Sequence, residues 1–586
     1  MADEPLVIRG INWRETLPFT NLFRAFRVAV HPSKLVLGLI LLLSIYAGGR
    51  ILDGIWPARY LAVPGEVSRY EELRSTGATP QQFLEDRRAA RAALEAIYAE
   101  RLLADQIVTK REEAAEEAEE GDKLGQLKDK ILTRRESAVA AAVKARDEEL
   151  AARRKELKDD ALEDAERAIH ARYNETARGA HRAAYQDYRS LKLIKGVGLF
   201  SSLFDYQSSQ LLNIVRGVLS GNFVGGFAGD PRPDGVIRST INFFTVGPLW
   251  LMRHHPVYFV VFSLMFLTLW AVFGGAIARI AAVHVARDEK LSVRAALQFS
   301  IGKFLSFVSA PLIPLIIVLI VGLVPILAGF LAAIPYVGPV LNILLGALFI
   351  LVIAAGFVMT LVLLGTFGGF NLMYPTIAVE GSDSFDAISR SFSYVYARPW
   401  RMIFYTLVAV VYGALCYVFV RLFVGLMLAL THQFVDIGHF AEAPSTEPLW
   451  QTMWVGPATR LTYDIDFLTL RGDQDIAAGL VAFWVYLVVG MVGAFVISFY
   501  FSANTIIYYL MRREVDATEL DDVYVEQSDE DFGEPMPPTP GSPAEEAAAA
   551  AVAPTAAAEA SSAAADAAPS DEPPPSSAEP GAPPST

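Results

Sequence analysis

The polar side chains best placed for chemistry follow an apolar stretch that ends at Leu430. His432, Asp436 and His439 are spaced so that one face of a helix would carry all three. Two imidazoles and a carboxylate form a donor set that binds a divalent metal. However, Gly438 weakens a helix at this point and the spacing supplies no fourth ligand, so the alternative is a polar turn beside a membrane. We therefore expect no metal centre and no cofactor.

A second candidate is an arginine inside an apolar stretch. Arg421 is flanked by Phe419-Val420 and Leu422-Phe423. An ionisable group inside a bilayer costs about 2.5–3.5 kcal/mol on insertion scales and usually faces protein or a water-filled cavity. Asn504, in the last apolar stretch, is a possible buried polar partner. The two residues suggest a pathway for a substrate or an ion, and the alternative is an arginine that reaches out to the headgroups.

Motifs for covalent catalysis and for nucleotide binding do not occur. The sequence contains no Gly-x-Ser-x-Gly, no His-Glu-x-x-His, no phosphate-binding glycine loop and no dinucleotide fingerprint. Its single cysteine, Cys416, excludes a disulfide framework and a cysteine-based zinc site. We expect no catalytic residue, no enzyme activity and no nucleic-acid partner.

Six apolar stretches position these candidates. Each is long enough for a helix that crosses a hydrocarbon core, which needs about 20 residues. The sequence therefore predicts an all-α fold, a six-span transmembrane helical bundle, with the first span in 35–56 and five more in 256–511. The stretches are Leu35–Leu52, Val257–Val283, Phe304–Ile334, Leu341–Phe370, Met402–Leu430 and Ile476–Leu510.

Basic residues set the expected orientation. Lys and Arg gather before the first span, between spans two and three, between spans four and five, and at Arg512-Arg513 after the last. Cytoplasmic loops carry such an excess, and all four segments share one side only if six spans cross. We expect a multi-pass protein of the bacterial cytoplasmic (inner) membrane with both termini cytoplasmic. Residues 1–34 would supply an interfacial helix.

A charged insertion, residues 57–255, follows the first span and would lie outside the cytoplasm. Thr79-Pro80 predicts a helix start, and Gly121 to Gly125 interrupts a sequence rich in Ala, Glu, Arg and Leu. We expect a long, coiled-coil-like helical hairpin over 80–190. Its second arm relies on alanines, whose burial yields little, so this segment could pack against a second copy or an envelope partner.

The acidic net charge comes from the end of the chain. Residues 514–586 contain 17 acidic and no basic residues, so the total of −14 leaves the preceding 513 residues at +3. Residues 512–586 are also rich in Ala, Pro and Ser and poor in large apolar side chains. The composition predicts a disordered C-terminal tail.

Two of the basic loops resemble each other. Ala286-Arg287-Asp288 with Ser292 matches Ala378-Val379-Glu380 with Ser384 at an offset of 92, and Phe-Gly-Gly precedes each at 273–275 and 367–369. Each copy reads as a span, a short amphipathic helix and the next span. The pattern suggests a duplicated unit with both loops on one side.

The second copy also carries a family resemblance. Residues 374–381, 387–391 and 399–401 resemble a loop of bacterial multi-pass proteins grouped as glycerophosphodiester phosphodiesterase membrane-domain-like or related uncharacterised membrane proteins, and 507–514 is similar to the end of their last span. The resemblance covers about forty residues. It implies a membrane architecture and no catalytic residues in this part. The positions that carry it include Pro375, Glu380, Ser391, Pro399 and Trp400.

Two functions follow from these features. The large charged insertion and the lack of convergent chemistry favour a structural or interaction protein that anchors an extracytoplasmic helical hairpin. The alternative is a membrane transport or lipid-handling bundle. It depends on Arg421, on the duplicated unit and on three prolines in the third apolar stretch, at 311, 314 and 325.

Overall fold

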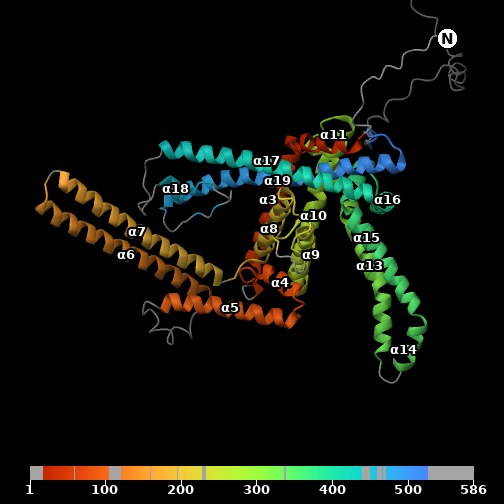
Figure 1. Cartoon of the computed structure of the whole chain (residues 1–586), viewed down its shortest axis with the longest axis horizontal. Coiled ribbons are helices and arrows are strands. Elements are labelled where there is room, and N and C mark those ends of the chain that lie inside the picture. The colour runs from red at the N-terminus through yellow and green to blue at the C-terminus, as the bar shows by residue number, and fades with distance from the viewer. Residues whose placement is uncertain are drawn as a thin grey trace, which may run out of the picture. The chain divides into compact units, whose positions relative to one another are not determined.

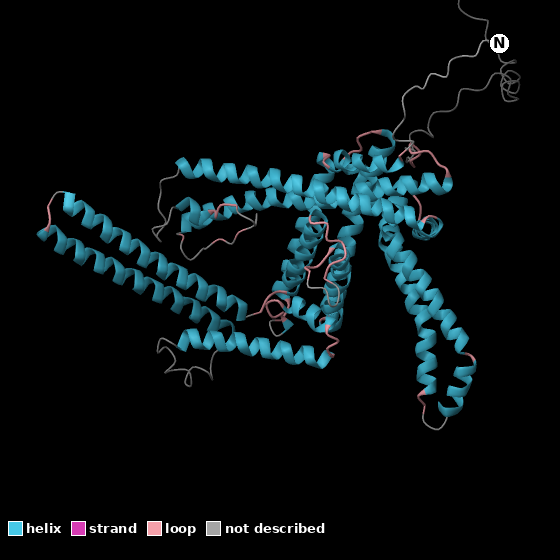
Figure 2. Cartoon of the chain, in the orientation of Figure 1, coloured by secondary structure: helices cyan, strands magenta, loops and turns pink. Residues whose placement is uncertain are grey.

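The chain is built almost entirely of helices (Figure 2). The computed structural model describes residues 17–57, 60–103, 120–158, 160–194, 196–226, 232–334, 338–438, 449–457, 463, 465, 470 and 472–524. Within these ranges, a single β-bridge between Ala62 and Val197 is the only strand-like pairing. The predicted all-α fold is confirmed.

Six helices are long and apolar enough to cross a membrane, as the sequence predicts. The second span combines two α-helices with one π-helical turn. Several of these helices continue past their apolar stretch into polar residues. The chain is therefore an integral membrane protein. The spans (Figure 1) are α3 (Pro32–Ile55), α10 (Pro256–Leu269) with η3 (Trp270–Gly274) and α11 (Gly275–Arg287), α13 (Phe304–Ala332), α15 (Phe349–Glu380), α17 (Pro399–Gly438) and α19 (Gly472–Asp516).

The prolines of the third span do not end its helix. Pro311, Pro314 and Pro325 all lie inside α13, which stays one helix over 29 residues. Most of its apolar side chains face outward, and Leu319 and Phe330 are each 70% exposed. Such exposure suits a lipid-facing span, because hydrocarbon solvates these side chains. After α14 (Gly338–Ala347), α15 returns alongside α13 (Figure 1).

The two resembling segments have the same local construction. The helix α11 ends at Asp288, whose φ of 56° is left-handed, and the hydroxyl of Ser292 accepts a hydrogen bond from the amide of Ala295 at the start of α12 (Val293–Gly302). Likewise, α15 ends at left-handed Gly381, and the Asp383 carboxylate caps α16 (Ser384–Ala397). Each short helix then leads into the next span.

Glycine brings each short helix against its own span. A Cβ built on Gly275 of α11 would lie 2.4 Å from the Ser300 hydroxyl of α12. A Cβ built on Gly369 of α15 would lie 3.2 Å from the Ser391 Cβ of α16. Both glycines are the last residue of a Phe-Gly-Gly motif. The repeated motif therefore has a packing role, which supports the interpretation of these segments as copies of one unit.

The main core surrounds α19. This helix contacts α3, α11, α15 and α17, and also α2 (Arg24–Ala29), which follows η1 (Pro18–Phe23). Residues 276–282 of α11 are almost completely buried in the same core, where alanines allow the helices to approach closely. The Ser498 hydroxyl of α19 donates to the Ala29 carbonyl at 2.7 Å. The N-terminal helices are thereby fixed to the last span.

The first helix of the predicted hairpin begins where the sequence predicts, but the helices of the insertion pair in a different way from the prediction. Thr79 and Gln82 form reciprocal side-chain to amide hydrogen bonds, of 2.7 and 3.3 Å, at the predicted start of α5. The predicted break at Gly121 to Gly125 is wrong, because α6 runs through both glycines. The helices are α4 (Glu66–Ser75), α5 (Pro80–Leu103), α6 (Glu120–Glu156), α7 (Asp160–Ile194), α8 (Leu199–Leu219) and α9 (Val236–His254).

The antiparallel pair in the insertion is α6 with α7, which lie side by side in Figure 1. Ion pairs join Arg154 to Glu166 at 2.8 Å and Glu149 to Arg172 at 3.2 Å, so positions approach in reverse order. The chain reverses between Glu156 and Asp160. Glycine inside a helix costs only about 1 kcal/mol of stability. Burial of apolar side chains between α6 and α7 stabilises the pair by more than this cost. These buried residues are Ile131, Leu150, Ile169, Ala177 and Ala184.

The ordered chain also extends further than its composition predicts. Residues 512–516 complete α19, and 517–524 fold back on the core with Val523 buried. The expected tail boundary at 512 is therefore wrong, because local ion pairs and one apolar contact retain this acidic segment. Residues 525–586 form a separate unit that lies outside the described residues.

The close approach of α16 to α15 can be tested at Gly369. We expect Gly369→Leu to lower the free energy of unfolding by about 1–3 kcal/mol, because its side chain would overlap Ser391. The matched control is Gly356→Leu in the same helix, where a new Cβ meets no atom within 4 Å. Thermal unfolding of both variants in detergent measures the difference. Equal melting temperatures for the two would contradict this packing role.

Candidate functional site

Two of the three residues proposed from sequence as metal ligands, His432 and Asp436, make other contacts. His432 lies near the end of α17, where its Nε2 is 2.9 Å from the Trp454 carbonyl oxygen, and its ring packs against Trp450 and Trp454. Asp436 accepts a hydrogen bond from the amide of Gln451 at 3.4 Å. His439 lies outside the described residues. Within the described ranges no three His, Cys, Asp or Glu side chains converge as metal ligands.

The two residues proposed to line a pathway belong to neighbouring spans. Arg421 is half-buried on α17, and Asn504 is buried on α19. The Asn504 amide nitrogen donates to the Tyr500 carbonyl at 2.9 Å, one turn earlier in the same helix. This is a common way for a span to satisfy a buried amide. A pathway through these residues stays a prediction.

Three helix ends meet at Glu380. This residue ends α15, and its carboxylate receives the Nε atoms of Arg390 from α16 at 2.9 Å and of Arg512 from α19 at 3.4 Å. The Tyr508 hydroxyl of α19 also donates to it. The two sequence segments that resemble the membrane-domain family, around 380 and around 510, therefore meet at one carboxylate. We call Glu380, Arg390, Tyr508 and Arg512 the Glu380 cluster.

The Arg390 guanidinium remains charged in this cluster. Burial alone would lower its pKa, but the carboxylates of Glu380 and Asp386 outweigh burial and raise the pKa. Tyr394 of α16 donates to Asp516, and burial with this hydrogen bond raises the pKa of the phenol. Positive guanidinium groups and protonated phenols thus face carboxylates. Each acid already accepts at least one bond, so the arrangement suits a structural ion network better than a general base.

Residues 517–524, here the return segment, complete this face. Arg512 binds the carboxylate of Asp522 at 2.6 Å, and the amide of Tyr524 donates to the Val379 carbonyl at 2.8 Å. The Arg279 guanidinium of α11 donates to the carbonyls of Ala378 and Tyr524, each at 2.7 Å. The return segment is thereby joined to α11 and α15.

The remaining family-like positions lie in or at the ends of helices. Residues 374–380, expected in a loop, instead form the last turns of α15, with Pro375 buried inside the helix. The expected loop is therefore wrong, because apolar burial carries the helix on to Glu380. Ser391 is buried and its hydroxyl donates to the Ala387 carbonyl at 2.6 Å. Pro399 starts α17, and Trp400 is 80% exposed there, as suits an aromatic side chain at the membrane interface.

A second polar cluster, at the end of span one and the start of span two, was not predicted from sequence. Asp53 near the end of α3 accepts from the amides of Phe200 and Ser201 at 2.9 and 3.1 Å, and so caps α8. It also accepts from the Tyr258 hydroxyl of α10 at 2.8 Å. One carboxylate thus joins both spans to the insertion. The partners are separated from Asp53 by about 150–200 residues, so no local pattern marks them.

Two glutamates of α4 extend this outer cluster. Glu66, only 1% exposed, accepts from the Trp250 indole at 3.1 Å and pairs with Arg87 of α5 at 3.2 Å. Glu71 accepts from the Tyr206 hydroxyl at 2.7 Å and from the Asn242 amide at 2.6 Å. We call Asp53, Glu66 and Glu71 with these partners the outer carboxylate cluster. It links α3, α4, α5, α8, α9 and α10.

Hydrogen bonding controls the ionisation of Glu66. Burial alone would raise the pKa of its carboxyl, but the His255 side chain, the Arg87 charge, the Val63 amide and the Trp250 indole lower the pKa below its usual value. The carboxylate form is therefore stabilised in the fold. The acid functions as a joint rather than as a proton donor at neutral pH.

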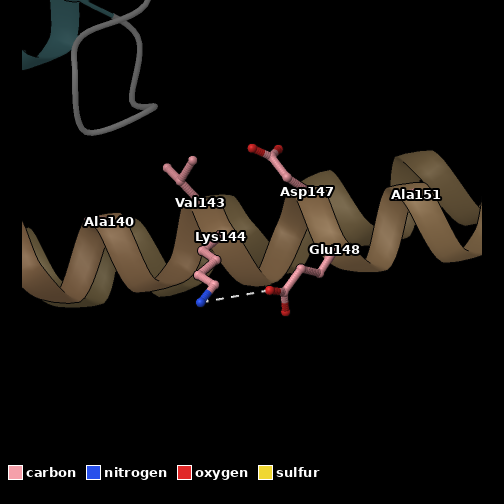
Figure 3. Close-up of a pocket in the computed structure, with 6 residues that line it drawn as sticks. All are labelled: Ala140, Val143, Lys144, Asp147, Glu148 and Ala151. Carbon is pink, nitrogen blue, oxygen red and sulfur yellow. Dashed lines mark ion pairs between the residues drawn. The ribbon is translucent and has the colours of Figure 1, made fainter.

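The α6 surface has a shallow depression with a single wall (Figure 3). All the residues that line it come from α6, and Lys144 pairs with Glu148 at 3.9 Å across one helical turn. A single helix face cannot enclose a small molecule, so this feature is an open helix surface rather than a cavity. Its lining comprises Ala140, Val143, Lys144, Asp147, Glu148 and Ala151.

Comparison with protein-family models, with curated proteins and with solved structures finds no match to this chain. The resemblance around Glu380 therefore stays a prediction. Function has to be inferred from the geometry of the two clusters and of the α6 surface.

The role of the Glu380 cluster can be measured by removing one charge. We expect Glu380→Gln to lower the free energy of unfolding by about 2–4 kcal/mol, because it leaves Arg512 and Arg390 without their shared counter-ion. In the control Asp386→Asn, a more exposed partner of Arg390 is lost, and the expected cost is at most about 1 kcal/mol. Thermal unfolding in lipid nanodiscs reports both. A smaller loss for Glu380→Gln than for Asp386→Asn would contradict the assigned role.

The outer cluster should respond to pH through His254. Burial first, and then the charges of His255 and Arg87, lower the pKa of His254 from 6.5 to about 4. Because the folded pKa lies below the unfolded one, stability is complete above pH 6.5 and falls as the pH drops toward 4. The side chain is partly exposed, so we expect a loss of about 1–2 kcal/mol.

Thermal unfolding between about pH 5 and 7.5 measures this effect. This pH range is used because it lies above the range in which Glu66 titrates. The variant His254→Gln should show a smaller pH dependence than the wild type, whereas His170→Gln, at an exposed position of α7, should retain the wild-type dependence. An unchanged slope in His254→Gln would assign the pH dependence to another group.

Proposed function

We propose that this integral membrane protein anchors and presents an extracytoplasmic helical pair, α6 with α7, to a protein partner or to a second copy. The outer carboxylate cluster carries the proposal. Three acids with multiple donors fix the base of the insertion to spans one and two, and a chain of contacts leads from there toward the pair. A cluster in which every carboxylate accepts several hydrogen bonds is rigid, and it would hold the base of the insertion in a fixed position.

The connection from the cluster to the pair passes through α5. Arg87 of α5 pairs with Glu66, and Arg69 of α4 lies 3.7 Å from Asp86 of α5. In turn α5 contacts α7, which pairs with α6 along its length. Apart from its buried seam, the pair exposes most of its charged side chains. An element fixed at its base and exposed along its sides is suited to binding another molecule.

Contacts among the basic segments support the proposed orientation. Arg27, before the first span, lies 3.5 Å from Asp288 in the connection between spans two and three. Arg390, between spans four and five, shares Glu380 with Arg512 at the end of the last span. All four basic segments thus gather on one face. With the positive-inside tendency, we assign this face to the cytoplasm and the insertion to the outside.

The α6 face in Figure 3 offers the proposed contact surface. Ala140, Val143 and Ala151 are small or branched apolar residues on one stripe, and Asp147 lies among them. Small side chains allow a second helix to approach closely, and charges beside them select its register. Either an envelope protein or a second copy of this chain would fit this chemistry.

Both the orientation and the contact can be tested with two single-cysteine substitutions, one on this surface and one between spans two and three. We expect Asp147→Cys to react in intact spheroplasts with a membrane-impermeant maleimide, and Glu289→Cys, between spans two and three, to react only after the membrane is opened. The native Cys416 is buried and gives a low background. A photoreactive maleimide on Asp147→Cys should then yield a discrete adduct, whose mass distinguishes a second copy from another protein. Labelling of Glu289→Cys alone in intact cells would reverse the orientation, and the absence of an adduct would remove the contact.

Two further variants separate anchoring from transport. Replacing 120–194 by a short Gly/Ser linker should reproduce the phenotype of a full gene deletion, whereas Arg421→Leu should retain wild-type growth. The reverse pattern would favour the transport or lipid-handling function.

A further inference from the structure

Three basic side chains meet where the first span begins beside the end of α11. His31 is the N-cap of α3, Lys34 lies in its first turn, and His284 lies in the last turn of α11. The imidazoles of His31 and His284 pack edge to face, with ring centroids 5.5 Å apart. The Lys34 ammonium acts electrostatically on both rings. The three residues therefore form one basic group at the proposed cytoplasmic end of the bundle.

Lys34 is buried without a counter-ion. Its exposed fraction is 0%, and its Nζ has no hydrogen-bond partner. The Nδ1 atoms of His31 and His284 are also buried without a partner. Burial of an unpaired ammonium is one of the largest penalties that a fold can contain. Elsewhere in the described chain, buried charges such as Glu66 and Arg279 have several partners.

The surrounding charge favours an anion rather than a neutral group. Arg27 and Lys290 add positive charge, and burial together with Lys34 and Lys290 lowers the pKa of His31. The nearby carboxylate of Asp288 is shared between Arg27 at 3.5 Å and His284 at 3.3 Å. In addition, the N-terminus of α3 carries the positive end of the helix dipole and no side-chain cap. The start of α3 and the end of α11 thus combine buried nitrogen atoms that have no hydrogen-bond partner with a positive electrostatic potential.

We propose that a phosphate group binds between the start of α3 and the end of α11, and that it accepts hydrogen bonds from Lys34, from His31 and from the imidazolium form of His284, whose Nε2 faces Asp288. A tetrahedral phosphate has enough oxygen atoms to serve donors from several directions at once. Arg27, whose side chain is 76% exposed, lies beside Asp288 at the surface, where its charge would attract an anion from solvent or from the headgroup layer. The phosphate belongs either to an anionic lipid or to a free anion. This site does not depend on the proposed anchoring function.

The experiment uses the full-length protein, purified in detergent and depleted of lipid. Inorganic phosphate is added in one arm, and in the other the protein is placed in nanodiscs of phosphatidylglycerol or of phosphatidylcholine. We expect a higher melting temperature with phosphate, with phosphatidylglycerol, or with both. Stabilisation by inorganic phosphate indicates a free anion, and stabilisation by phosphatidylglycerol alone indicates a lipid headgroup. Equal melting temperatures in all arms would overturn the proposal.

Lys34→Met is the decisive variant. It should weaken binding of the stabilising probe about 10- to 100-fold, the usual effect of one lost charge-assisted hydrogen bond. Without anion it should melt at or above the wild-type temperature, because it removes an unpaired buried charge. The control Lys303→Met removes the same charge near the start of α13, and should bind like the wild type. Wild-type affinity in Lys34→Met, or equal loss in both variants, would refute the site.

Discussion

Helices in a bilayer must satisfy their own backbone hydrogen bonds, so little in their apolar middle parts specifies which helices pack together. In this protein that specification lies at the helix ends. Glu380 joins α15, α16 and α19 on one face, and Asp53 joins α3, α8 and α10 on the other. Between these joints the core also contains large side chains such as Phe307 and Phe501, and small residues allow close approach at Gly275 and Gly369. Two carboxylates thus fix an arrangement that apolar packing alone would leave open.

The two clusters differ in what they connect. The Glu380 cluster gathers helices that are all within or beside the membrane bundle, together with the return segment. The outer carboxylate cluster connects the bundle to the insertion, with Glu66 reaching α5 through Arg87. Loss of the first would therefore separate spans, whereas loss of the second would release the insertion from spans that remain assembled. The proposed anchoring function would need both clusters.

The sequence predicts those features that depend on local composition. The six spans follow from apolar runs of sufficient length, and the start of α5 follows from Thr79-Pro80, with proline at the first helical position. The reversal of α6 into α7 could not be placed, because the glycines at 121 and 125 are stronger local signals than the polar residues near 158. The clusters were also missed in large part. Glu380 was singled out by resemblance, but Arg512 lies far along the chain, and the partners of Asp53 are about 150–200 residues away.

The return segment determines where mechanical load enters the molecule. Because Tyr524 is bonded to Val379 and Arg279, a pull on the chain beyond it is not applied first to the end of α19. The force is instead distributed over the hydrogen bonds that join the return segment to α11 and α15. An attachment of this kind resists extraction of the last span and passes tension to α11 and α15 together.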